Sequence, residues 1–141
     1  MNLCSTRFAL VLGIALASPF CVRGAQIKQV SLDSAVLGDW RGQSVCVVRE
    51  SACHDEDSLY HVTKLPEKPG SFSIKLDKIV DGKPVTMGTT ECSYSPAARS
   101  LTCEFPRGIM RFTVIGDKME GTMTLANGTL WRKLALKRQT Q

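Results

Sequence analysis

The chain of 141 residues is 43% apolar and 22% charged, and its formal net charge is +5. This composition is ordinary for one globular domain and excludes an intrinsically disordered chain. The positive charge does not form the clustered basic face that nucleic-acid binding requires, because Arg132, Lys133, Lys137 and Arg138 alternate with leucines as on a solvated strand. We therefore expect no nucleic-acid partner.

Residues 1–24 have the pattern of a signal peptide. Arg7 precedes an apolar run over residues 8–17, which is too short to span a bilayer, and Val22 and Gly24 are suitable residues before a cleavage bond. Cleavage there removes two of the 18 basic residues and none of the 13 acidic ones, which leaves a charge of +3. No second apolar run follows. We expect a periplasmic or secreted monomer that has no membrane attachment after cleavage.

Four of the six cysteines remain in the mature chain: Cys46, Cys53, Cys92 and Cys103. An even number of cysteines in an exported protein predicts disulfides, and three pairings are possible.

The mature chain divides into an N-terminal arm over residues 25–37, with a short helical turn, and an all-β domain over residues 38–141. Asp81-Gly82 and Asn127-Gly128 are strong hairpin signals, and short β-rich runs recur at the spacing of sandwiches and barrels. The pattern predicts an antiparallel up-and-down meander of eight or nine strands. The expected strands are 40–49, 59–65, 71–79, 83–87, 89–95, 100–105, 109–115, 118–125 and 129–137.

The turns also predict the register, because residues directly opposite in an antiparallel pair share one face. Two-residue turns at Asn127-Gly128, Gly116-Asp117 and Pro106-Arg107, with a loop over 96–99, give one continuous apolar face. This register sets Cys92 opposite Cys103 and therefore selects that disulfide, which leaves Cys46 to pair with Cys53. Other expected pairs are Leu125 with Leu130, Met123 with Arg132, Met119 with Leu136, Val114 with Met119, Phe112 with Gly121, Leu101 with Phe112 and Tyr94 with Leu101.

Nothing in the sequence predicts an enzyme. The chain has only two histidines, His54 and His61, as candidate general bases, and no nucleophile elbow, phosphate loop or metalloprotease helix is present. Zinc at Cys46, Cys53 and His54 is disfavoured by the spacing and by the exported context. We expect no catalytic residue, no metal and no cofactor.

Gly38-Asp39-Trp40 opens the first predicted strand, and Arg132 faces the apolar side of the last one. A Gly-x-Trp on the first strand with an arginine on the last resembles the lipocalin and broader calycin barrels. The segments Lys78–Lys83, Met119–Met123 and Gly128–Lys133 are also similar to uncharacterised exported bacterial proteins with a lipocalin-like domain. The resemblance implies a small closed barrel in which Arg132 stacks on Trp40 at one end.

Two functions are consistent with this resemblance. The first is binding of a small apolar or amphipathic molecule inside the barrel, by Tyr94, Met110, Phe112, Met119 and Met123. The second is protein binding, as in small exported protease inhibitors of this architecture, through the arm over residues 25–37. An outward-facing Trp131 would be a further contact of that kind.

Overall fold

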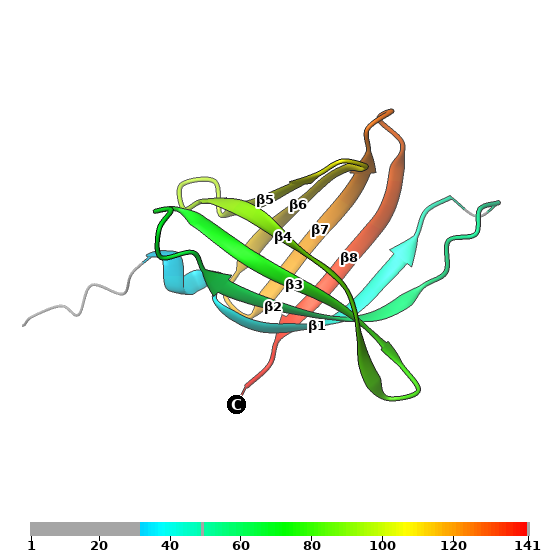
Figure 1. Cartoon of the computed structure of the whole chain (residues 1–141), viewed down its shortest axis with the longest axis horizontal. Coiled ribbons are helices and arrows are strands. Elements are labelled where there is room, and N and C mark those ends of the chain that lie inside the picture. Colours follow the sequence, from blue (N-terminus) through cyan, green and yellow to red (C-terminus); the bar gives the residue numbers. More distant parts are fainter. Residues whose placement is uncertain (1–31, 49, 141) are drawn as a thin grey trace, which may run out of the picture.

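A computed structural model describes residues 32–48 and 50–140. The predicted signal peptide over 1–24, the predicted mature start at Ala25 and residues 25–31 of the predicted arm lie outside the described residues. Over residues 32–48 and 50–140 the chain forms a 3₁₀ turn and eight strands (Figure 1). The turn is η1 (Leu32–Ala35), and the strands are β1 (Gly38–Cys46), β2 (Glu56–Lys64), β3 (Ser71–Val80), β4 (Lys83–Ser95), β5 (Ser100–Phe105), β6 (Gly108–Ile115), β7 (Lys118–Leu125) and β8 (Leu130–Arg138).

The strands form a closed antiparallel barrel in which each strand pairs with the next and β8 pairs with β1. The predicted all-β meander is therefore confirmed. The strands expected over 83–87 and 89–95 form a single strand, β4. Leu76 pairs with Gly88 and Asp77 with Thr86, so Met87 is the extra residue of a bulge within β4, which changes the pairing without ending the strand.

The predicted register is confirmed over most of β4 to β8. Leu125 does not face Leu130, however, because Leu125 is hydrogen-bonded to Thr129, and the loop that these two residues close, 126–128, has three residues rather than two. The Leu125 N–H donates to the Thr129 carbonyl at 2.9 Å, and Gly128 has a φ of 86°, as in a type I turn with a glycine bulge. Thr124 consequently pairs with Leu130, and the register shifts between Met123 and Thr124. The confirmed pairs are Cys92 with Cys103, Tyr94 with Leu101, Leu101 with Phe112, Val114 with Met119, Phe112 with Gly121, Met119 with Leu136 and Met123 with Arg132.

Both predicted disulfides are present. Cys92 joins Cys103 across β4 and β5, where both residues are buried in the core. Cys46 joins Cys53 across the loop from β1 to β2. The largest fully buried side chains include Trp40, Phe72 and Phe112. The first disulfide thus belongs to the core, and the second restrains a loop at one end of the barrel.

Gly42 makes the contact between β1 and β8 possible. A Cβ atom at this position would lie 2.1 Å from the Ala135 carbonyl oxygen and 2.9 Å from the Leu136 Cα. Both are backbone atoms of the strand that closes the barrel, so any larger side chain would push the two strands apart.

The contact between β4 and β5 is much shorter than β4 itself. Pairing with β5 covers only Cys92–Ser95, whereas pairing with β3 extends along β4 to Lys83. Residues 83–91 therefore form an edge, which in the described part of the chain has no strand on its β5 side. The β3–β4 hairpin projects beyond the barrel at this place (Figure 1).

A candidate ligand-binding cavity at one end of the barrel

A cavity of about 650 Å³ lies at the end of the barrel away from η1, next to the free edge of β4. Its volume is within the range of small-molecule sites. It is open to solvent between β4 and the turn that joins β5 to β6. Its lining comprises Ser44, Glu56, Tyr60, Leu76, Met87, Gly88, Thr89, Thr90, Glu91, Glu104, Phe105, Pro106, Arg107, Met110, Met123, Trp131, Arg132 and Leu134.

One part of the wall is apolar and is supplied by inward-facing residues of five strands. Met110 and Met123 are paired in the register of β6 and β7, and Leu76, Phe105 and Leu134 come from β3, β5 and β8. The hairpin extends this wall, because Val80 and Lys78 share the face of Leu76, and Val85 lies opposite Lys78. Val80, Val85 and Met87 are each more than 40% exposed there. This face therefore carries apolar side chains from solvent toward the cavity, interspersed with Lys78 and Lys83.

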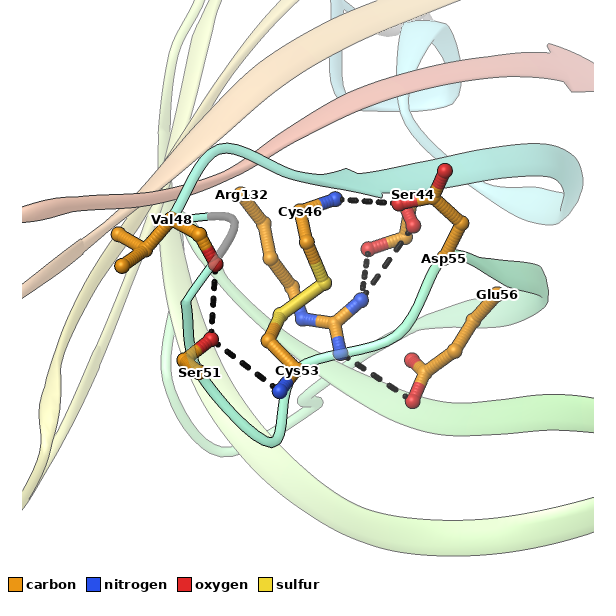
Figure 2. The surroundings of a disulfide bond; sticks show 8 residues. All are labelled: Ser44, Cys46, Val48, Ser51, Cys53, Asp55, Glu56 and Arg132. Carbon is orange, nitrogen blue, oxygen red and sulfur yellow. Dashed lines mark hydrogen bonds and ion pairs between the residues drawn. A yellow bond between two sulfur atoms is a disulfide. The ribbon is translucent and has the colours of Figure 1, made fainter.

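The other part of the lining is polar and is centred on Arg132. Its Nη1 donates to the Ser44 carbonyl at 3.3 Å and to Ser44 Oγ at 3.2 Å, and its Nη2 lies 3.3 Å from Glu56 Oε1. Figure 2 shows the guanidinium lying between Ser44 of β1 and Glu56 of β2. The Arg132 side chain is 13% exposed and that of Glu56 22%. The two opposite charges are largely withdrawn from solvent and compensate one another.

The Cys46–Cys53 disulfide helps to hold this polar group in place. Cys46 is opposite Arg132 in the pairing of β1 with β8, and its N–H donates to Asp55 Oδ1 at 2.7 Å (Figure 2). The disulfide and this hydrogen bond join the end of β1 to the residues just before β2. Ser44 and Glu56 are directly opposite one another in the pairing of β1 with β2. The loop therefore positions both partners of Arg132.

Tyr60 adds a neutral hydroxyl to the lining. Burial raises the pKa of Tyr60 to about 12, and the neighbouring Ser58 hydroxyl opposes this shift only in part. The phenol is consequently protonated at neutral pH and can donate or accept a hydrogen bond.

The residues predicted to bind a ligand divide into two groups. Met110 and Met123 line the cavity. Phe112 and Met119 are buried in the core, at 1% and 0% exposed, and do not line it. Tyr94 packs edge-on against Phe72, with ring centroids 6.2 Å apart. Phe112 and Met119 belong to the core cluster that includes Trp40 and Val36, and Tyr94 packs against this cluster.

The predicted stacking of Arg132 on Trp40 is wrong, and Arg138 takes this position instead. The Arg138 guanidinium lies 4.1 Å from the centre of the Trp40 ring. In the pairing of β1 with β8, Trp40 is opposite Arg138, whereas Arg132 is opposite Cys46. Six residues of strand separate these positions, which corresponds to about 20 Å. Trp40 and Arg132 therefore mark opposite ends of the barrel.

The described part of the N-terminal arm packs against the closed end of the barrel. Val36 is 0% exposed, and its carbonyl accepts a hydrogen bond of 2.9 Å from Trp40 Nε1. Asp33 forms an ion pair of 2.6 Å with Lys64 of β2. Trp131 is half-buried at the cavity and does not face outward, because the bulge that follows Leu130 changes its direction.

A second polar cluster lies outside the barrel on β1, β2 and β3. His61 Nδ1 is 2.7 Å from Asp39 Oδ1, and His61 Nε2 is 3.2 Å from Asp77 Oδ2. Lys75 Nζ donates to the same Asp77 oxygen at 3.0 Å. Burial alone would raise the pKa of Asp77, but hydrogen bonds from Thr86, Lys75 and His61 together lower it. The buried carboxylate therefore remains ionised.

The fold and the cavity define a disulfide-bonded, eight-stranded antiparallel barrel that is closed at one end and open to solvent at the other. A scan against protein-family models finds no match for this chain, and a search of curated proteins finds no related sequence. Within residues 32–48 and 50–140, no helix has the length and hydropathy that a membrane span requires.

Two signals in the sequence could have located the polar lining. Arg132 was predicted to face the apolar interior, where a guanidinium requires a polar partner. Alternation along the first two strands from Trp40 and Tyr60 places Ser44 and Glu56 on the same inward face. Their meeting with Arg132 depends on how β1 closes against β8, which no turn specifies.

Proposed function

We propose that this protein is an exported, lipocalin-like binding protein that holds a small amphipathic molecule in the open end of its barrel. The observation that carries this proposal is the cavity of about 650 Å³ that combines an apolar wall with a polar lining. An amphipathic molecule matches both parts, since its tail can contact Met110, Met123 and Leu76 while its head group reaches Arg132 and Tyr60.

The cellular location is part of the same proposal. All four cysteines beyond the predicted leader form disulfides, which is typical of an oxidising compartment. The leader pattern over residues 1–24 supports export. The lipocalin-like assignment is supported by the closed barrel, by the Gly38-x-Trp40 opening of β1 and by an arginine of β8 over the indole, although that arginine is Arg138.

The alternative of an inhibitory arm has less support. Residues 33–37 are held against the barrel by the Lys64–Asp33 ion pair and by the Trp40 hydrogen bond to Val36. They are therefore engaged within the molecule rather than free to enter the cleft of a partner.

The proposal is tested by titrating the purified protein with the neutral fluorescent probe N-phenyl-1-naphthylamine. We expect saturable binding at one site. Gly88→Leu is expected to weaken binding by about tenfold or more, because a Cβ at Gly88 meets nothing within 4 Å and a larger side chain would fill the cavity. Met119→Leu is the matched control, since Met119 is buried outside the cavity. Absence of saturable binding, or binding that Gly88→Leu leaves unchanged, would overturn the proposal.

A further inference from the structure

We propose that the cavity selects amphiphiles whose head group is polar but has no net charge, because Arg132 and Glu56 present opposite charges side by side at the polar part of its lining. This inference rests on the proposed function and specifies the class of ligand.

The Arg132 and Glu56 side chains are in mutual contact, at 3.3 Å between Nη2 and Oε1, and both line the cavity. An anionic head group that approached the guanidinium would also approach the carboxylate, so attraction and repulsion would largely cancel. A cationic head group near Glu56 would meet the same cancellation from Arg132. Neither sign of charge gains a net advantage at this position.

The remaining charges around the cavity are also balanced. Glu91, Glu104 and Arg107 lie at its rim. Lys68 forms an ion pair of 2.7 Å with Glu91. Together with Arg132 and Glu56, these residues are three acids and three bases. Apart from Lys78, which the hairpin carries on the face of Leu76 beyond the cavity lining, these residues add no preference for either sign.

Hydrogen-bonding capacity remains at the same place. A guanidinium has five N–H donors, and those of Arg132 make three contacts with Ser44 and Glu56. The Glu56 carboxylate lies 3.3 Å from Arg132 through Oε1, and because a carboxylate has about four acceptor positions it can also accept from a head group. Tyr60 adds a protonated hydroxyl. A head group with both donors and acceptors, such as a glycerol ester, an amide or an alcohol, can use all three side chains without displacing the ion pair.

Three amphiphiles with the same tail test the inference: glycerol monodecanoate, decanoate and decyltrimethylammonium. The affinity of each is measured by its displacement of bound N-phenyl-1-naphthylamine at slightly alkaline pH, where decanoate is ionised. We expect the wild-type protein to bind the neutral ester about tenfold more tightly than either ion, a ratio equivalent to about 1.4 kcal/mol. Glu56→Gln should strengthen decanoate binding relative to the ester by about the same factor, since the guanidinium then faces the anion alone.

Asp57→Asn is the matched control for Glu56→Gln. It removes the same charge from the next residue of β2, where Asp57 forms an ion pair of 2.7 Å with Arg41 on the opposite face. The order of the three ligands should stay as in the wild type. Arg132→Gln supplies the mirror test and should favour the cation, and it replaces Glu56→Gln if that variant does not fold.

The outcomes separate the inference from the proposed function. Wild-type binding of decanoate as tight as that of the ester, or a ligand order that neither Glu56→Gln nor Arg132→Gln changes, overturns the charge-balance inference and leaves amphiphile binding intact. Failure of the neutral probe and of all three amphiphiles to bind overturns both. If the ion pair had only a structural role, the two variants would change thermal stability without changing the ligand order.

Discussion

The guanidinium of Arg138 lies 4.1 Å from the centre of the Trp40 indole ring, and the two side chains close one end of the barrel. Arg138 also donates hydrogen bonds to the carbonyls of Leu37 and Ala35, which belong to the turn before β1. Trp40 donates to the carbonyl of Val36 in the same turn. The last strand is thus joined to the N-terminal turn through both side chains.

We expect Arg138→Met to lower the free energy of unfolding by about 1–3 kcal/mol, because it removes charge-assisted hydrogen bonds and a cation–π contact. Urea unfolding followed by tryptophan fluorescence measures this change. Lys137→Met is the control, since Lys137 is exposed on the outer face of β8 and its replacement should cost less than about 0.5 kcal/mol. Equal effects of the two substitutions would contradict the structural role of Arg138.

Gly42→Ala tests the closure of the barrel. The new methyl group would lie 2.1 Å from the Ala135 carbonyl oxygen, so β1 and β8 must separate. We expect a loss of stability of about 1–3 kcal/mol or more in thermal or urea unfolding, as for other overpacked sites. Gly88→Ala provides the comparison, because its Cβ would meet nothing within 4 Å. A Gly42→Ala protein as stable as Gly88→Ala would indicate that the two strands are not in close contact.

The two disulfides are expected to differ in what their removal affects. They close loops of 8 and 12 residues, with sequence separations of 7 and 11, so each should stabilise the fold by about 2.5–3 kcal/mol. Replacing Cys92 and Cys103 by alanine should act only through stability. Replacing Cys46 and Cys53 by alanine should also weaken probe binding, because their loop positions Ser44 and Glu56. Peptide mapping without reduction checks the connectivity, and a Cys53–Cys92 peptide would contradict both the disulfides and the register.

Asp77 should make stability depend on pH in the acidic range. Its pKa is lowered in the folded protein, so ionised Asp77 stabilises the fold above its unfolded-state pKa, near 3.8. This contribution is lost as the pH falls below that value through the folded pKa. Asp77→Asn should therefore lower the melting temperature at neutral pH. In strong acid, where Asp77 of the wild type is protonated, the melting temperatures of the two proteins should lie closer together. A difference that does not change across this range would show that ionised Asp77 contributes nothing to stability.

Hydrogen exchange should distinguish the two parts of β4. Amides over residues 83–91 that point away from β3 have no strand partner on that side, whereas Cys92–Ser95 pair with β5. Backbone groups on an edge exchange through smaller openings than those inside a sheet. We expect faster exchange for alternate amides of the first segment, measured by nuclear magnetic resonance. Uniform protection along β4 would show that another part of the chain covers this edge.

The sequence by itself determined the strands from β5 to β8, most of their pairing and both disulfides. The reason is that a short turn fixes the register of the two strands beside it, and alternation then assigns each residue to a face. Cys92 and Cys103 were placed opposite one another by this local logic. It fails at Asn127-Gly128 only by the single residue that distinguishes a three-residue loop from a two-residue turn.

Only the tertiary structure decided how the barrel closes and where it remains open. The pairing of β1 with β8 joins residues that are almost a hundred positions apart, such as Trp40 and Arg138, and no turn connects them. Their register follows from the tilt and stagger of all eight strands together, to which every hairpin and bulge contributes. For this reason the prediction of Arg132 over Trp40 was wrong, and Arg138 takes that position. The meeting of Arg132, Ser44 and Glu56 at the cavity depends on the same closure.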